Sequence, residues 1–376
     1  MDILTDYAVP FLIVLTILVF VHESGHFLVA RYNNVRVEIF SIGFGTELFG
    51  FNDSHGTRWK FSAIPLGGYV KMFGEGEIIE DEDKDKEREL TDEEKAVSFH
   101  HKRLGQRAAI VFAGPFANFV FAVIVLAGLF FASGAPNPLA GIGAVQPGSA
   151  AEKAGITAGD KVIMIAGQDV KWFEDLRQIV IMNPNIPLSM EIIRDNSQLT
   201  LIATPKAQVV EESGVEREIG LLGVTPHPEM VEYTNVGPLD AVVMGAERTY
   251  GLTLNILNAV GRMITGSVSR EELGGPLRIA QISGQMAQGG LASMVFFLAA
   301  LSINLGLINL FPIPMLDGGH LIFYFIEAIM GRPVNEKAQE YSFRFGLILV
   351  LLLMVFVTWN DLVQLEVFEY FKNLVS

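Results

Sequence analysis

The chain contains no cysteine among its 376 residues, and this excludes two kinds of site. It can form neither a disulfide bond nor a thiolate metal centre, so any metal must be bound by histidine, aspartate or glutamate. Basic residues are scarce as well: 27 lysines and arginines face 42 acidic residues, giving a formal net charge of −15. Nucleic-acid binding needs clustered positive charge, so we expect no nucleic-acid partner.

The amino terminus lacks the features of a secretory signal. Residues 1–6 are acidic where a signal peptide would be basic, and no small-residue cleavage site follows the first apolar run. We therefore expect the first hydrophobic segment to remain in the mature protein.

Hydrophobic residues make up 50% of the chain, and four stretches are long enough to cross a bilayer. They are residues 9–30, 108–132, 291–311 and 345–359. A fifth stretch, residues 321–330, is too short to cross and is expected to pack against its neighbours. The predicted fold class is a polytopic α-helical membrane protein with about four transmembrane helices. We bound the segments that contain them at 1–34, 104–133, 290–331 and 332–376.

The segments between the spans differ in character. Residues 35–74 hold β-branched and aromatic residues punctuated by glycine, which predicts strands and hairpins. Residues 75–103 begin with an almost uninterrupted charged run, typical of a solvated loop. Residues 134–208 alternate apolar and polar positions between glycine turns, which predicts a small β-rich domain. Residues 209–289 are expected to be a linker with one amphipathic helix, lying on the membrane or on that domain.

Orientation follows from the basic residues next to the spans, because cytoplasmic loops carry an excess of them. These residues are Arg31, Arg36, Lys102, Arg103, Arg107, Arg332, Lys337 and Arg344. We predict that both termini and residues 133–290 lie outside, and that residues 31–107 lie inside.

The sequence His22-Glu23-Ser-Gly-His26 matches the pattern H-E-x-x-H. On a helix, positions i and i+4 share a face, so both imidazoles can reach one zinc ion. Glu23 then sits beside the open position of the metal, where it can act as a general base. As a bare pattern this is short and occurs by chance in many proteins.

The location of this motif inside the first span makes it more specific. Each ionisable side chain would cost at least ~2.5 kcal/mol at mid-membrane, so such residues usually mark a function. At about 1.5 Å per residue, His22 lies about 12 Å inside the end of the span, nearer the inner face. The alternative is a histidine pair in a loop or core at a wrongly assigned span.

A catalytic zinc normally has three protein ligands, so one remains to be found. No histidine follows His26 at the spacing of a metzincin, and Glu38 belongs to no helical continuation. The best candidate is Asp317, just past Pro312 and Pro314, which end the third span. Irregular backbone at this depth is tolerated where it lines a cavity or is buried in protein.

Two asparagines, Asn304 and Asn309, lie on the same broken span. Their amides can hold a substrate backbone in extended form, or they can bond to other helices, as polar residues in membranes often do. His320 follows a glycine turn and is interpreted as a polar residue without an assigned role.

Three motifs together resemble the site-2 protease family of intramembrane metalloproteases. They are H-E-x-x-H in the first span, Gly114-Pro-Phe-Ala-Asn118 in the second and Leu316-Asp-Gly318 in the third. The resemblance covers essentially the whole chain. Residues 141–167 resemble a PDZ domain of the bacterial protease type, present once, whereas the best-known member of the family carries two in tandem.

The resemblance implies roles for particular residues. It implies that His22, His26 and Asp317 bind zinc and that Glu23 is the general base. It also implies substrate contacts from the third span and from the edge of a membrane-reentrant β-hairpin. These contacts would come from Asn304, Asn309, Ile64, Gly67 and Gly68.

The resemblance further implies a zinc metalloendopeptidase of the bacterial inner membrane that performs regulated intramembrane proteolysis in a stress response. Its partners would be membrane lipid, single-pass substrates such as an anti-sigma factor already trimmed outside, and remnants of signal peptides. The active site would lie towards the cytoplasm and the PDZ domain in the periplasm. That domain would either exclude untrimmed substrates by size or bind a new carboxyl terminus.

Two other kinds of membrane protein must be compared with the protease. A zinc transporter can carry intramembrane histidine and aspartate, but it needs neither a glutamate beside the first histidine nor a PDZ-like insert. A catalytically inactive scaffold would be expected to lose the H-E-x-x-H set, which is intact here. The sequence favours the protease.

Overall fold

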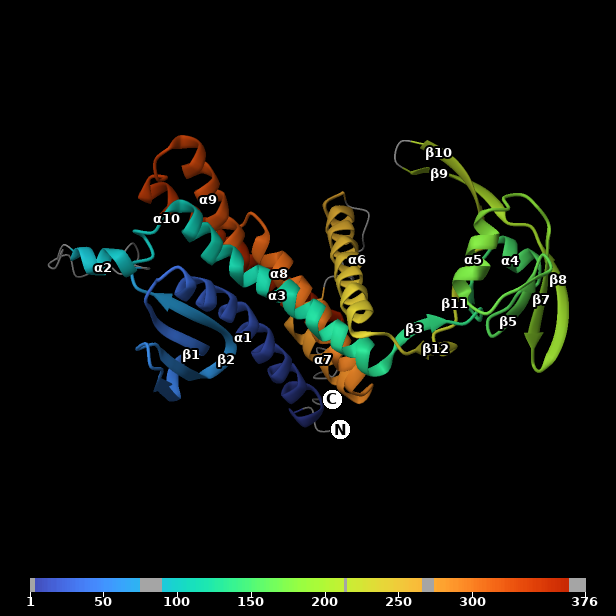
Figure 1. Cartoon of the computed structure of the whole chain (residues 1–376), viewed down its shortest axis with the longest axis horizontal. Coiled ribbons are helices and arrows are strands. Elements are labelled where there is room, and N and C mark those ends of the chain that lie inside the picture. The colour runs from blue at the N-terminus through green and yellow to red at the C-terminus, as the bar shows by residue number, and fades with distance from the viewer. Residues whose placement is uncertain (1–3, 75–89, 213–214, 266–273, 365–376) are drawn as a thin grey trace, which may run out of the picture. The chain divides into compact units, whose positions relative to one another are not determined.

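The structure is a computed structural model that describes residues 4–74, 90–212, 215–265 and 274–364. The chain forms two units: residues 1–129 together with 242–376, and residues 130–241. We call the first the membrane unit and the second the inserted unit (Figure 1).

Four of the described helices, all predicted, are long and apolar enough to cross a membrane. They are α1 (Val9–Tyr32, preceded by the π-helix η1, Leu4–Ala8), α3 (Leu104–Ser133), α8 (Leu291–Leu310) and α10 (Glu336–Gln364). Three further helices are α6 (Pro238–Ile264), α7 (Pro276–Gln288) and α9 (Asp317–Met330). Helix α6 is the predicted amphipathic helix, whereas α7 replaces part of the predicted linker.

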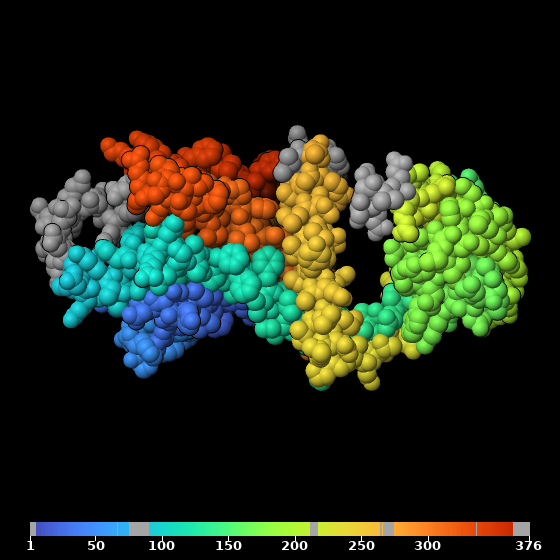
Figure 2. All heavy atoms as spheres, turned by 45° about the horizontal axis from the view of Figure 1, so that its top comes forward, coloured from blue at the N-terminus to red at the C-terminus, as the bar shows by residue number. Residues whose placement is uncertain are grey.

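Glycines let three of these helices approach one another closely. A side-chain carbon on Gly25 of α1 would lie 2.2 Å from the Ala113 carbonyl oxygen of α3. One on Gly306 of α8 would lie 3.1 Å from the Pro115 carbonyl oxygen, also in α3. Small residues commonly mediate such contacts in membranes, because packing replaces the hydrophobic effect there. Helix α3 therefore contacts both α1 and α8, and Figure 2 shows these segments packed into one body of the membrane unit.

A sheet of β1 (Val37–Asn52) and β2 (Arg58–Met72) confirms the strands predicted for residues 35–74. Phe40 of β1 pairs with both Trp59 and Val70, so the first part of β1 lies between the two ends of β2. The sheet packs on α1 and α3 through a hydrophobic cluster that includes Phe27, Phe40 and Ile110. This packing places the end of β2 beside α1.

The predicted loop at residues 75–103 contains a short helix, α2 (Asp92–Val97). The Thr91 hydroxyl accepts a hydrogen bond from the Glu94 backbone N–H at 3.2 Å, and the Glu94 carboxylate accepts one from the Thr91 N–H at 2.9 Å. This capping box explains why the chain becomes helical here. The charged run at 75–89 lies outside the described residues.

A buried carboxylate joins α7 to the last span. Asp361 of α10 accepts hydrogen bonds from the backbone N–H groups of Gly275 at 2.7 Å and Leu277 at 3.0 Å. These donors belong to the first turn of α7, where backbone N–H groups have no partner within the helix. The negative charge is also favoured there by the helix dipole.

The inserted unit is β-rich, as predicted. Its elements are β3 (Ala135–Pro138), β4 (Ile142–Val145), α4 (Ala150–Lys153), β5 (Lys161–Ile165), β6 (Gln168–Asp169), α5 (Phe173–Ile181), β7 (Leu188–Arg194), β8 (Ser197–Ala203), β9 (Lys206–Glu212), β10 (Val215–Leu221), β11 (Val224–Pro226) and β12 (Val231–Thr234). The main sheet has the order β6-β5-β7-β8. A core around Ile142, Leu176 and Met190 lies beneath it.

The predicted boundary at residue 208 is wrong. Strand β11 pairs with β4, and β12 pairs with β3, so residues beyond 208 belong to this unit and not to a linker. The physical reason is that β3 and β4 each need a partner for their exposed edge, and the returning chain provides it.

Breaking the Asp160–Arg194 ion pair is expected to destabilise the inserted unit. The Asp160 side chain is fully buried and accepts two hydrogen bonds of 2.7 Å from the partly exposed Arg194 guanidinium. We expect Asp160→Asn to cost about 2–3 kcal/mol, below the value for a fully buried pair. Hydrogen exchange of β5 and β7 amides in the full chain measures this. Glu174→Gln, which breaks an exposed ion pair with Arg177, is the control and should cost less than about 1 kcal/mol.

The same ion pair predicts a pH dependence. Burial works to raise the pKa of Asp160, but the hydrogen bonds from Arg194 outweigh it and hold the pKa below its ordinary value of 3.8. A lowered pKa in the folded state stabilises the fold fully above the ordinary aspartate pKa. We expect this contribution to disappear as the pH falls through the lowered pKa, and to be absent from the Asp160→Asn variant at every pH.

Candidate active site and metal centre

Three side chains that the sequence assigns to a zinc site converge in the structure. Nε2 of His22 lies 3.2 Å from Oδ2 of Asp317, and Nε2 of His26 lies 3.6 Å from the same oxygen. The two Nε2 atoms are 3.3 Å apart. One ligand atom from each residue thus lies within 4.8 Å of the other two.

This set of donors fits a zinc ion. Oδ2 of Asp317 is buried and has no hydrogen-bond partner among the described residues, although it faces two imidazole nitrogens. Burying a carboxylate oxygen without a partner destabilises the folded state. A bound metal ion would provide the partner that Oδ2 lacks. Two imidazoles and one carboxylate form a common ligand set of catalytic zinc, with a fourth position left open.

Asp317 reaches the histidines because the chain turns sharply after α8. Met315 has a φ of 85°, in the left-handed region that bulky residues rarely adopt. Gly318 lets the turn fold onto its own backbone, since a side-chain carbon there would lie 2.2 Å from the Phe311 carbonyl oxygen. Asp317 is the first residue of α9, where the helix dipole favours a carboxylate.

Helix α3 orients both histidines. Nδ1 of His26 lies 2.9 Å from the Ile110 carbonyl oxygen, and Nδ1 of His22 lies 3.0 Å from the Asn118 amide. With Nδ1 engaged in this way, Nε2 of each ring is left to face the metal. Coordination through Nε2 puts the proton on Nδ1, so zinc binding requires the Asn118 amide to turn its oxygen towards His22.

Asn118 is a functional residue for which the sequence analysis gave no role. Its side chain is fully buried in the middle of a span, and Ser302 of α8 donates a hydrogen bond of 2.9 Å to its backbone oxygen. A buried amide within a membrane segment was the available signal.

Replacing Asn118 by leucine is expected to weaken zinc binding by about 10- to 100-fold, the usual cost of losing such a supporting hydrogen bond. The leucine keeps the volume of the side chain but cannot orient His22. Competition with a chelator measures the affinity. Ser283→Ala, which removes a hydrogen bond of 2.7 Å to the Ile279 carbonyl oxygen within α7, is the control; equal losses in the two variants would contradict the assignment.

Glu23 lies between the zinc ligands and the sheet. A side-chain carbon on Gly68 would lie 2.7 Å from Val19 and 3.4 Å from Cγ of Glu23. The end of β2 therefore runs directly beside the predicted general base.

The three β-region residues of the predicted substrate site do not lie together. Gly68 contacts α1, as described above, whereas Ile64 pairs with Phe44 further along the sheet and is half exposed. Gly67, with a φ of 120°, lies against the Phe44 ring, which a side-chain carbon there would meet at 2.4 Å. The structure therefore brings Gly68, but not Ile64 or Gly67, into contact with α1, the helix that carries Glu23.

Asn304 and Asn309 lie in the last two turns of α8, and both are half-buried. Within the part of the chain that the structure describes, neither side-chain amide has a hydrogen-bond partner. The ring of His320 lies 4.9 Å from that of Phe343.

Known proteins match this chain over nearly its whole length. The model of peptidase family M50 matches residues 10–353. A protein of Rhizobium meliloti named "Putative zinc metalloprotease" is 43% identical over 369 residues, covering 96% of this chain and 99% of the relative. A protein of Agrobacterium fabrum with the same description is 43% identical over 365 residues, covering 96% and 97%. A Regulator of sigma E protease of Salmonella typhi is 33% identical over 455 residues, covering 94% and 98%.

Proposed function

The chain belongs to peptidase family M50 and is a zinc-dependent metalloendopeptidase, and we propose that it cleaves single-pass membrane proteins within or near their transmembrane segments. The observation that supports this proposal most strongly is the convergence of His22, His26 and Asp317 beside Glu23. His22, Glu23 and His26 lie on α1, which can cross a membrane, and Asp317 follows α8, a second helix of that kind. A zinc transporter would not need Glu23 at this place, and an inactive scaffold would not need the complete set.

The chemistry assigned to the chain's own residues is proton transfer. His22, His26 and Asp317 would hold the zinc ion, which when bound polarises a carbonyl group and lowers the pKa of water. Glu23 accepts the proton of the attacking water and later passes it to the leaving amine. Helix α3 keeps both imidazoles in the orientation that this reaction requires.

A transmembrane substrate must be extended before it is cut, because the peptide bonds of a helix are shielded. The end of β2 offers a strand edge beside Glu23, on which a substrate can be held by main-chain hydrogen bonds. The amides of Asn304 and Asn309 would bind the other side of the extended backbone. Gly68 is the part of the β region that supports this role; Ile64 and Gly67 would contact substrate residues further from the bond that is cut.

We assign the inserted unit as a PDZ domain that selects substrates on the periplasmic side of a bacterial inner membrane. The glycine-rich pattern of residues 141–167 and the basic residues at the opposite ends of the spans support this placement. The 33% identical relative is named as a regulator of sigma E, which supports an anti-sigma factor as the substrate class.

The test is cleavage of a model single-pass protein by the purified enzyme in lipid vesicles, with the products mapped by mass spectrometry. We expect a cut within or near the apolar segment that a chelator abolishes and added zinc restores. Cleavage confined to soluble loops of the substrate would contradict the proposal.

The role of the inserted unit has its own test. Strands β3 and β12 pair, with Pro138 opposite Val231, so residues 139–230 can be deleted and the stem closed by a short glycine link. If the unit excludes large substrates, this deletion permits cleavage of an untrimmed substrate. If it binds a new carboxyl terminus, the deletion abolishes cleavage of a trimmed one.

A further inference from the structure

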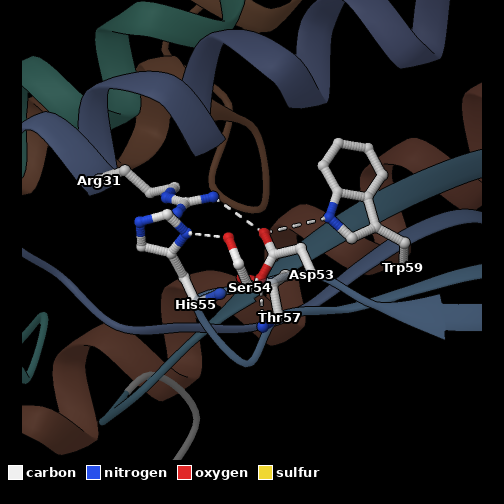
Figure 3. A network of polar contacts seen from close by, with 6 residues as sticks. All are labelled: Arg31, Asp53, Ser54, His55, Thr57 and Trp59. Carbon is white, nitrogen blue, oxygen red and sulfur yellow. Dashed lines mark hydrogen bonds and ion pairs between the residues drawn. The ribbon is translucent and has the colours of Figure 1, made fainter.

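A single carboxylate, that of Asp53, connects the turn between β1 and β2 to helix α1. Oδ1 of Asp53 accepts hydrogen bonds of 2.9 Å from the backbone N–H groups of His55 and Thr57, which closes the turn. Oδ2 accepts one of 2.9 Å from Arg31, in the last turn of α1, and one of 3.4 Å from the Trp59 indole (Figure 3). We call Arg31, Asp53 and Trp59 the latch.

The latch continues into the packing between the sheet and α1. The Trp59 ring stacks on that of Phe40, with 4.2 Å between centroids, and meets the Phe27 ring of α1 edge-on at 5.2 Å. The Arg31 guanidinium lies 5.1 Å from the centroid of the same Phe27 ring. The charge pair and the aromatic rings thus join both strands of the sheet to α1 along a continuous line of contacts.

Hydrogen-bonded strands connect the latch to the active site. Trp59 pairs with Phe40, and Phe40 pairs in turn with Val70, in the end of β2 that contacts Glu23 at Gly68. On the helix side, Arg31 stands eight residues after Glu23, about 12 Å along α1. The latch and Glu23 therefore fix the same sheet to the same helix at two separate points.

We propose that Arg31 and Asp53 are positioning residues that set which peptide bond of an extended substrate meets Glu23. This rests on the proposed function, in which the substrate pairs with the edge of β2. The latch fixes how far the sheet lies along α1, and so it fixes the register of any strand added to that edge. A strand can slip only by two residues if the same side chains are to face the same way.

The experiment compares the bonds cut in one single-pass substrate by the wild-type enzyme, Arg31→Ala and Asp53→Asn. Asp53→Asn keeps an oxygen for the two turn amides but removes the charge that Arg31 pairs with, so it tests the latch without opening the turn. We expect part of the cleavage to move to bonds two residues away. We also expect kcat/KM to fall by no more than about fivefold, as for an ion pair of this exposure, with zinc content unchanged.

Two matched variants complete the experiment. Arg58→Ala breaks the Arg58–Glu47 ion pair in the same sheet, which does not involve α1, and should leave the cut bond unchanged. Arg31→Lys keeps the charge and should restore most cleavage to the original bond.

The outcomes separate this proposal from the proposed function. Less product in both latch variants with every cut still at the original bond, or a shift of the cut bond in Arg58→Ala as well, would overturn the positioning role. If the wild-type enzyme cleaves no single-pass substrate, the proposed function fails and the latch proposal fails with it.

Discussion

Replacing Glu23 by glutamine is expected to abolish cleavage while zinc stays bound. Glutamine has the size of glutamate and leaves His22, His26 and Asp317 untouched, but it cannot accept the proton of the attacking water. General-base catalysis typically contributes about 10²–10⁴ in rate, so residual activity should fall by at least that much. Product formation and metal content, measured on the same purified sample, check the prediction.

The matched control for this variant is Glu38→Gln. Glu38 lies in β1, where it forms exposed ion pairs with Arg36 and Lys71 at 3.9 and 3.8 Å. Its replacement should leave both activity and zinc content close to those of the wild type. Activity that survives in Glu23→Gln, or zinc lost from it, would show that Glu23 does not have the assigned role.

Replacing Gly114 by alanine is expected to remove zinc and activity together. A side-chain carbon at this position of α3 would lie 2.2 Å from Nε2 of His26, the atom assigned to the metal, and 2.5 Å from Cε1. Real atoms do not approach so closely, so the imidazole must move out of the site. The loss of zinc affinity should exceed the roughly 10- to 100-fold that loss of a supporting hydrogen bond costs.

Gly128, on the same helix, provides the control for Gly114→Ala. No atom of the described residues outside its own stretch of helix lies within 4 Å of a side-chain carbon placed there. Gly128→Ala should therefore keep zinc and activity, and should stabilise α3 slightly, by up to about 1 kcal/mol. Equal behaviour of the two alanine variants would mean that the tight contact at Gly114 has no bearing on the metal.

The convergence of His22, His26 and Asp317 could be predicted because its signals are local. His22 and His26 are one helical turn apart, and a pair of prolines shows where the third span ends before Asp317. The short helix α2 was not predicted, although Thr91 and Glu94 have the spacing of a capping box. The many charged residues around it led us to interpret the whole segment as a loop.

What the sequence could not provide is which helix faces which. The contacts of His22 with Asn118 and of His26 with Ile110 join residues 96 and 84 positions apart. They depend on α1 and α3 packing through Gly25, and no periodicity within either helix specifies that pairing. The pairing of β11 with β4 and of β12 with β3 was missed for the same reason. The alternation of residues within a strand does not specify which distant strand pairs with its edge.

The pairing of β3 with β12 also bears on how this chain can change in evolution. The chain enters and leaves the inserted unit through one two-stranded stem, with Ala135 opposite Thr234. Domains whose ends lie close together can be inserted into another chain without disturbing it. The 455-position alignment with the Salmonella relative is longer than this chain, so the two proteins differ by insertion. A stem of this kind would let the inserted unit be replaced or enlarged while the membrane unit is inherited intact.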